Sequence, residues 1–134
     1  MEKQTTIKNK ITLKGKGLHT GKNVEVNILP AQANSGIVFK RIDLENPVIV
    51  KAEAEAVTET SRGTTIEAKG AKVATIEHLM AALYASNIDN ALIEINGEEV
   101  PILDGSSKYW LEAIEKSGVE ELEKERKYFC SSCN

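Results

Sequence analysis

The sequence predicts an α+β fold, a two-layer sandwich in which two helices pack on one face of a mainly antiparallel sheet. In the first half of the chain, apolar residues alternate with polar ones, which is the period of half-buried strands. In the second half, apolar residues recur every three to four positions at two places, which is the period of amphipathic helices. Strands followed by a helix, a strand and a helix fit one layered domain, and 134 residues is the size of one domain.

Alternation and turn residues delimit the strands expected in the first half. They cover residues 7–14, 24–28, 37–40, 47–57 and 64–68. In the first of them, Ile11 and Leu13 alternate with lysine and threonine, and Asn9 falls on the same face. The composition of residues 47–57 also suits a helix, but alanine alternates there with glutamate, which favours a strand.

A first helix is expected where the period changes. Its apolar stripe consists of Ile76, Leu79, Met80, Leu83 and Tyr84. Asn87 is a suitable end for this helix. Residues 90–96 then predict a strand that leads into the tight-turn pair Asn96-Gly97. Residues 100–103 predict a short edge strand because they include Pro101, which has no N–H to donate.

A second helix is expected to follow residues 104–107, where Ser106 and Ser107 are suitable N-cap residues. Its buried face consists of Trp110, Ala113, Ile114 and Ser117. Gly118 is a suitable C-terminal stop. The remaining residues, 120–134, are mostly charged, so we expect a linker or tail there and a folded domain over residues 1–119.

Composition and charge argue against several classes of protein. The net charge of −3 has its signs interleaved, so no face is basic enough to predict nucleic-acid binding. No apolar run approaches the roughly 20 residues of a membrane helix, and no apolar leader begins the chain, so we expect a cytoplasmic protein without stable membrane insertion. Cys130 and Cys133 form a Cys-x-x-Cys pair near the end, which we interpret as incidental, with a redox or zinc-knuckle role as the alternative.

Glu77 and His78 are the residues most suited to chemistry. On a helical wheel His78 lies opposite the apolar stripe, among Ala81, Ala82 and Ala85, so another element could approach it closely. A neutral imidazole binds zinc well, and a nearby carboxylate can take a proton from zinc-bound water. The alternative is a solvated helix face, because a catalytic zinc needs three protein ligands and no second spaced ligand motif is present.

The other histidine, His19, lies in a glycine-flanked segment, residues 17–21. The glycines permit tight turning and a close approach of the backbone to a ligand. The alternative is a plain hairpin loop with an exposed histidine. The glycine spacing matches neither a phosphate-binding loop nor a dinucleotide fingerprint.

Four motifs in order resemble the UDP-3-O-acyl-N-acetylglucosamine deacetylase family, and the resemblance runs from about residue 5 to about residue 129. The motifs are Gly17-Leu18-His19-Thr20-Gly21-Lys22, Thr75-Ile76-Glu77-His78-Leu79-Met80-Ala81-Ala82-Leu83, Ile88-Asp89-Asn90 and Val100-Pro101-Ile102-Leu103-Asp104-Gly105-Ser106. The resemblance implies a ribosomal protein S5 domain 2-like fold. It also implies removal of acetate from a UDP-linked, 3-O-acylated glucosamine in lipid A synthesis.

The resemblance also implies a role for each candidate residue. Glu77 matches the general base and His78 matches a zinc ligand, while Leu18 and His19 match a loop near the substrate's sugar and scissile amide. The remaining zinc ligands, a histidine and an aspartate, come in this family from a second domain. That domain is expected to be absent from this chain, so we expect the chain alone to be inactive.

Two further expectations concern partners. The surface formed by Ala81, Ala82 and Ala85 would be covered by the second domain, and without it the chain is expected to self-associate through this surface. The alternative to an enzyme half is a non-catalytic binding or regulatory module that keeps the fold.

Overall fold

The computed structural model describes residues 3–53, 57–60 and 63–125, and over these residues it has ten strands and two helices. They are β1 (Lys3–Ile7), β2 (Ile11–Lys16), β3 (Asn23–Leu29), β4 (Ile37–Arg41), β5 (Val48–Lys51), β6 (Val57–Thr60), β7 (Gly63–Ala68), β8 (Ala71–Ala74), α1 (Glu77–Ala85), β9 (Ala91–Ile95), α2 (Lys108–Ser117) and β10 (Val119–Glu125).

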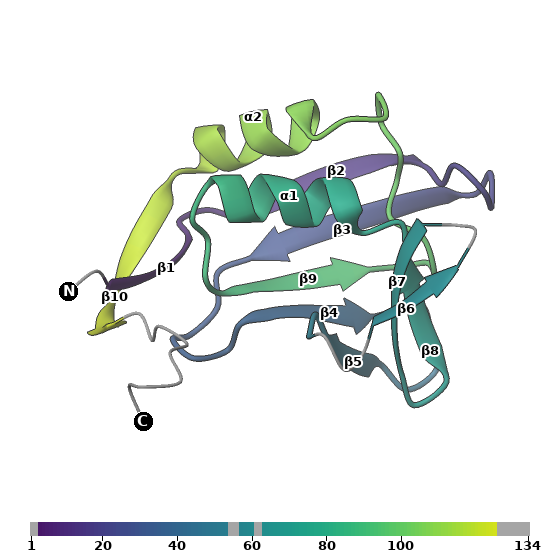
Figure 1. The fold of residues 1–134 in the computed structure, drawn as a ribbon, viewed down its shortest axis with the longest axis horizontal. Helices are drawn as coiled ribbons and strands as arrows, with labels where there is room; N and C mark the ends of the chain where they lie inside the picture. The colour runs from purple at the N-terminus through teal and green to yellow at the C-terminus, as the bar shows by residue number, and fades with distance from the viewer. Residues whose placement is uncertain (1–2, 54–56, 61–62, 126–134) are drawn as a thin grey trace.

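The main sheet has the strand order β2-β3-β9-β4-β5, and α1 and α2 lie together over one of its faces (Figure 1). All its neighbouring strands are antiparallel except β4 and β9, which run parallel. A three-stranded sheet, β6-β7-β8, stands at one end, and β1 pairs with β10 at the other. The predicted α+β sandwich with two helices on one face is therefore confirmed.

The core lies between the main sheet and the helices. Alternate residues of β3, β4 and β9 point toward the helices, as period-2 patterns require. The largest fully buried side chains are Trp110, Phe39, Ile7, Ile28, Ile66, Leu79, Leu83, Ile93, Ile95 and Ile114. As the composition suggests, branched aliphatic residues make up most of this core, and its aromatic residues are few.

The strand predicted over residues 7–14 is wrong as a single element. The structure has two strands in different sheets, β1 and β2, joined by a bend at residues 8–10. Side chains hold this bend: the Asn9 N–H donates to Ser117 Oγ at 3.0 Å, and Asn9 Nδ2 donates to the Ser117 carbonyl at 2.8 Å. The alternating pattern continues through the bend, but the partner strand changes.

Other strand boundaries also differ from the expected ones. The extended segment over 47–57 is divided into β5 and the start of β6, and residues 54–56 lie outside the described residues. Strand β8 was not predicted. The predicted tight-turn pair Asn96-Gly97 lies in a bend after β9, where Asn96 Oδ1 accepts the Glu25 N–H at 2.8 Å. Residues 100–103 form no strand, although the Ile102 N–H donates to the Lys16 carbonyl at 2.9 Å.

The helices match their predicted ranges, with three differences. Tyr84 is 86% exposed and does not belong to the buried stripe of α1. The Ser107 hydroxyl caps no N–H of α2 and instead donates to the His78 carbonyl at 2.9 Å, which joins the two helices. Ala82 is fully buried, so the surface predicted from three alanines consists of Ala81 and Ala85 only.

The charged residues 120–125, expected in a linker or tail, belong to β10, which pairs with β1 in antiparallel register from Ile7↔Val119 to Lys3↔Glu125. Most of their side chains are exposed, as is common on an edge strand, where charge discourages further pairing. Residues 126–134, with Cys130 and Cys133, lie outside the described residues, so the division into domain and tail stays a prediction. Neither described helix is long and apolar enough to cross a bilayer.

Candidate active site

The candidate residues from three motifs gather at one end of the sandwich. The turn between β2 and β3, the start of α1 and the segment that joins β9 to α2 all lie at the same end of the main sheet (Figure 1). Hydrogen bonds connect these three segments, as described below.

Glu77 is the first residue of α1, where a negative charge is favoured by the helix dipole. Its Oε2 accepts a long hydrogen bond from the Thr64 N–H at 3.5 Å. Its Oε1 is buried and has no hydrogen-bond partner among the described residues. Because a buried acceptor without a partner is costly, Oε1 is positioned for a donor that the described residues do not supply.

Gly63, at the start of β7, lies directly against the Glu77 carboxylate. A Cβ at this position would stand 2.6 Å from Glu77 Oε2, and the backbone φ of +92° favours glycine. The hairpin of β6 and β7 therefore packs its backbone against the candidate base without an intervening side chain.

We expect Gly63→Ala to lower the free energy of unfolding by about 1–3 kcal/mol, through backbone strain and the contact with Glu77. Gly70→Ala is the matched control, since Gly70 has a φ of +80° but open space around its Cβ position. The excess cost of the Gly63 change should disappear in a Glu77→Ala background, and urea unfolding of the four variants measures it. If the excess loss of free energy of unfolding is the same with and without Glu77→Ala, the contact between Gly63 and Glu77 is refuted.

His78 is half-buried on α1, next to Glu77. Its imidazole makes no hydrogen bond or ion pair with the part of the chain that the structure describes. Among those residues no group of three or more His, Cys, Asp or Glu side chains could hold a metal. His78 is thus a single ligand candidate beside one carboxylate.

Leu18 and His19 are exposed at the β2–β3 turn, and the Leu18 side chain is 58% exposed. The turn is closed by its own backbone, since the Gly21 N–H donates to the Gly17 carbonyl at 3.0 Å. The N–H groups of His19 and Thr20 point inward to one carboxylate, that of Glu99. The turn is ordered by these contacts while its two candidate side chains stay free to meet a ligand.

Glu99 is a further residue of this site that the sequence motifs do not predict. It is only 2% exposed, and its carboxylate also accepts the Thr75 hydroxyl at 2.9 Å. No local signal distinguishes it from its exposed neighbour Glu98, because burial here depends on segments about 80 residues away in the sequence. Burial acts to raise the pKa of the Glu99 carboxyl, but hydrogen bonds from Thr20, Thr75 and His19 outweigh it and the pKa is lowered.

The lowered pKa of Glu99 predicts a pH-dependent contribution to stability. A carboxylate with a depressed folded-state pKa stabilises the fold fully above the pKa of unfolded glutamate, about 4.3, and this stability is lost as pH falls through the folded value. We expect Glu99→Gln to be less stable than the parent at pH 7, with a difference that shrinks at about pH 3. Urea unfolding at both pH values measures this, and Glu98→Gln is the control. A difference that is the same at both pH values would refute it.

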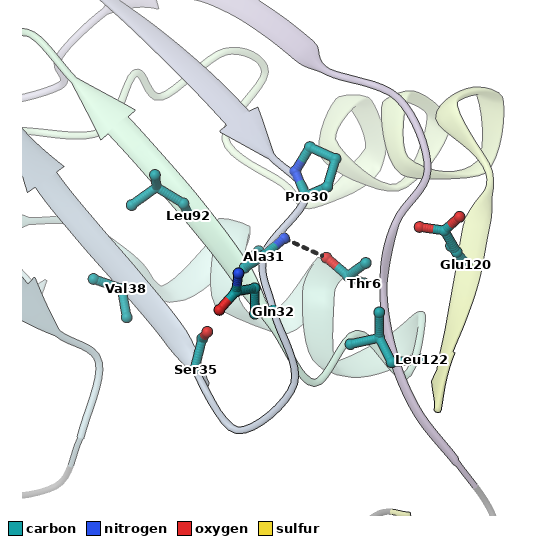
Figure 2. Close-up of a pocket in the computed structure, with 10 residues that line it drawn as sticks. Thr6, Pro30, Ala31, Gln32, Ser35, Val38, Leu92, Glu120 and Leu122 are labelled. Atoms are coloured by element: carbon teal, nitrogen blue, oxygen red, sulfur yellow. Dashed lines mark hydrogen bonds between the residues drawn. The ribbon is translucent and has the colours of Figure 1, made fainter. Parts of the chain in front are cut away.

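A cavity of about 520 Å³ lies between β1, β10 and the sheet strands β4 and β9 (Figure 2). It is lined mostly by apolar atoms, including those of Pro30, Val38, Leu92 and Leu122. None of the candidate residues Leu18, His19, Glu77 or His78 lines it, so it is separate from the site described here.

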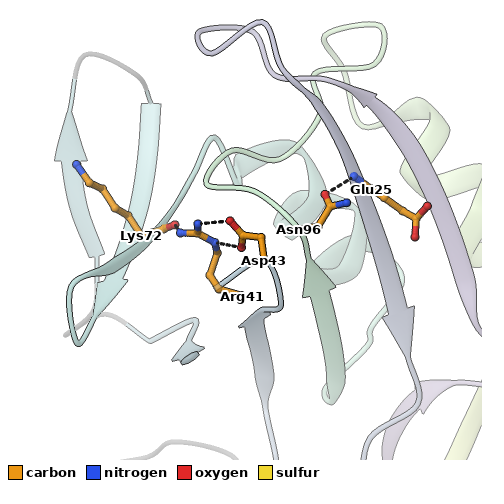
Figure 3. A network of polar contacts seen from close by, with 5 residues as sticks. All are labelled: Glu25, Arg41, Asp43, Lys72 and Asn96. Atoms are coloured by element: carbon orange, nitrogen blue, oxygen red, sulfur yellow. Dashed lines mark hydrogen bonds and ion pairs between the residues drawn. The ribbon is translucent and has the colours of Figure 1, made fainter. Parts of the chain in front are cut away.

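A smaller polar cavity of about 300 Å³ borders the site and includes Thr20 and Glu99 in its lining. Arg41 also lines it, and its guanidinium bonds to Asp43 and Lys72 (Figure 3). It pairs with Asp43 through two hydrogen bonds of 2.8 and 2.7 Å and donates to the Lys72 carbonyl at 2.9 Å. The hydrogen bond from Arg41 lowers the pKa of Asp43. The bond to the Lys72 carbonyl joins β4 to β8, and the ion pair with Asp43 orients the guanidinium.

The sequence model of one family, described as UDP-3-O-acyl N-acetylglycosamine deacetylase, matches residues 4–133. The chain belongs to this deacetylase family. It is 51% identical over 125 residues to the UDP-3-O-acyl-N-acetylglucosamine deacetylase of Geotalea uraniireducens, a match that covers 93% of this chain and 41% of the relative. It is 53% identical over 121 residues to the bifunctional enzyme LpxC/FabZ of Bacteroides thetaiotaomicron, which covers 90% of this chain and 26% of the relative. The chain thus spans less than half the length of these relatives.

Three of the four motifs that resemble the deacetylase family meet at the candidate site. The segment 100–106 packs against β2, where a Cβ on Gly15 would stand 3.0 Å from the Pro101 side chain. Within it, Asp104 accepts the Ser106 N–H at 3.1 Å, so its role at the approach to α2 is local turn formation.

The fourth motif of the deacetylase family, residues 88–90, has a structural role. Asp89 accepts the Thr5 N–H at 2.9 Å. Asn90 is 1% exposed; its Oδ1 accepts the Gly36 N–H at 2.9 Å and its Nδ2 donates to Gln4 Oε1 at 3.0 Å. These bonds join β1 and the residue before β4 to the start of β9, at the end of the main sheet opposite the start of α1 (Figure 1).

Proposed function

We propose that this chain supplies the general base and one zinc ligand of a deacetylase that removes the N-acetyl group of UDP-3-O-acyl-N-acetylglucosamine in lipid A biosynthesis. Membership of the family and the names of the relatives support the reaction and the substrate. The observation that carries the proposal for this chain is the buried Glu77 Oε1, which has no partner among the described residues, next to the half-buried His78 at the start of α1.

Zinc fits these residues as an incomplete ligand set. His78 would hold the metal, and the other protein ligands would come from the part of the relatives that this chain does not match. When bound, zinc supplies Lewis-acid polarisation of an amide carbonyl and makes water more acidic.

In the proposed reaction, Glu77 accepts a proton from the water that attacks the acetamide carbonyl. Thr64 N–H holds Oε2, so Oε1 is the oxygen left to receive the proton. The carbonyl carbon gains the water oxygen, the C–N bond breaks as the departing nitrogen takes up a proton to replace it, and acetate and the glucosamine amine leave; Glu77 then releases the proton that it accepted. Leu18 and His19 would contact the sugar near the scissile amide.

We expect the 134-residue chain alone to release no measurable acetate from this substrate and to retain little zinc, because one imidazole cannot hold the metal tightly. Acetate release and zinc content of the purified chain test this. Stoichiometric zinc together with turnover in the chain by itself would overturn it.

The decisive experiment is a hybrid protein in which this chain replaces the matched segment of the Geotalea uraniireducens deacetylase. The expected result is zinc-dependent acetate release. A folded hybrid that binds zinc and substrate but has no turnover would refute the proposal and favour a non-catalytic module.

The outer surface of α1, with Ala81, Tyr84 and Ala85, would face the region that completes the site. In the chain alone, this surface would allow self-association, since a contact of small residues around an exposed tyrosine permits close approach. Light scattering of the chain with and without a Tyr84→Glu change tests this. A monomer at all concentrations would refute it.

A further inference from the structure

We propose that Glu99 is a positioning residue of the deacetylase site, which ties the β2–β3 turn that carries Leu18 and His19 to the strained Thr75 before α1. The role in catalysis rests on the proposed function, whereas the tie itself stands on the contacts alone. Glu99 would touch no reacting atom. It would act by fixing where the turn lies relative to Glu77 and His78.

Both oxygens of the Glu99 carboxylate are used in this tie. Oε1 accepts the Thr20 N–H at 2.9 Å and the His19 N–H at 3.1 Å. Oε2 accepts the Thr75 hydroxyl at 2.9 Å and also lies 3.2 Å from the His19 nitrogen. Donors from two segments therefore converge on one buried anion, the arrangement in which hydrogen bonds are strongest.

Gly17 allows the turn to close over this carboxylate. A Cβ at Gly17 would stand 2.3 Å from Glu99 Oε1 and 2.5 Å from the Thr20 hydroxyl oxygen. No other residue type fits there without movement of the turn or of Glu99. This close approach of the Gly17 backbone to Glu99 and Thr20 is the reason that the motif has a glycine at this position.

Thr75 gives the tie its connection to the candidate base. It has a φ of +60°, which is strained for a β-branched residue, and it is buried two positions before Glu77. On either side, the Ala74 N–H donates to the Glu98 carbonyl at 2.8 Å, and the Ile76 N–H donates to the Thr64 carbonyl at 3.3 Å. The hydroxyl bond to Glu99 thus acts on the residue that sets the direction of the chain into α1.

A carboxylate is suited to this position and an amide is not. Glutamine has the same shape, but it offers one acceptor oxygen, and its NH2 group would face the N–H or O–H donors that now bind the second oxygen. Glu99→Gln should therefore release one of the two segments without removing bulk from the core. Glu98→Gln, the same change on the exposed neighbouring side chain, is the matched control.

The test uses the hybrid protein described above, with kcat and KM measured for the UDP-linked acylated substrate. The expected result for Glu99→Gln is a rise in KM of about tenfold or more, the effect of one lost hydrogen bond to a charged group, with a smaller change in kcat. Glu98→Gln should leave both constants unchanged. Thr75→Val, which keeps the shape and removes the hydroxyl, should show the same KM effect to a lesser degree, and it replaces Glu99→Gln if that variant does not fold.

The outcomes separate this inference from the proposed function. An active hybrid in which neither Glu99→Gln nor Thr75→Val alters KM overturns the positioning role and leaves the proposed function standing. An inactive parent hybrid overturns the proposed function and with it the catalytic role of Glu99. For the tie itself, the readout is amide hydrogen exchange at His19 and Thr20 in the 134-residue chain. Exchange at these two amides should speed up at least tenfold in Glu99→Gln relative to Glu98→Gln, and unchanged exchange refutes the tie.

Discussion

Glu77→Gln in the hybrid protein is expected to lower kcat for acetate release by about 10²- to 10⁴-fold, the usual contribution of a general base. Glutamine keeps the size of the side chain and its contact with the Thr64 N–H, but it cannot accept a proton. KM should change little, because the lost interaction belongs to the transition state. Steady-state kinetics across saturating substrate concentrations measure both constants.

Two comparisons make the Glu77 result specific. Glu112→Gln, on the exposed side of α2, should retain the parent's kcat. Zinc content should be kept in Glu77→Gln and reduced in His78→Ala, since only His78 is proposed as a ligand. A kcat for Glu77→Gln within threefold of the parent's would remove Glu77 from the role of base.

Trp110→Ala is expected to lower the free energy of unfolding of the chain by about 3–5 kcal/mol, as for other large buried aromatic residues truncated to alanine. Trp110 is the only tryptophan, is 1% exposed, and has the largest volume among the fully buried side chains. Single domains are stable by only about 5–15 kcal/mol, so this change removes a large share of the free energy of unfolding. Urea unfolding followed by circular dichroism measures it.

Tyr109→Ala is the control for Trp110→Ala. Tyr109 is the preceding residue of α2 and is 46% exposed, and the Lys108 ammonium lies 6.0 Å from its ring centre. Tyr109→Ala should lower the free energy of unfolding by no more than about 1 kcal/mol. Similar costs for the two variants would mean that α2 does not bury Trp110 in the main core.

Local periodicity predicts the elements that pack against the core. The central strand β9, the two helices and the end of α2 at Gly118 follow from patterns within ten residues. What the patterns miss is decided by distant partners. The charged β10 is a strand because β1 lies beside it, more than 110 residues earlier in the sequence, and residues 8–10 bend because Ser117 bonds to Asn9.

In the candidate site, too, local patterns identify some residues, and contacts with distant segments decide the others. The helical wheel identifies Glu77 and His78 as neighbours on one side of α1, but it cannot tell that Ala82 is buried, because α2 as well as the sheet packs on this helix. Glu99 and Gly63 have no periodic signature at all. Glu99 accepts hydrogen bonds from the β2–β3 turn, and Gly63 lies against the Glu77 carboxylate. Both contacts exist only in the folded chain.

The pairing of β1 with β10 has a mechanical consequence. In their antiparallel register, Lys3 lies opposite Glu125, so the two ends of the described chain meet at the same end of one ribbon. A pulling force applied at these two residues would open the ribbon like a zipper, loading its hydrogen bonds in succession. The ribbon should therefore yield under small forces, while the main sheet and the segments around Glu77 are still under no load.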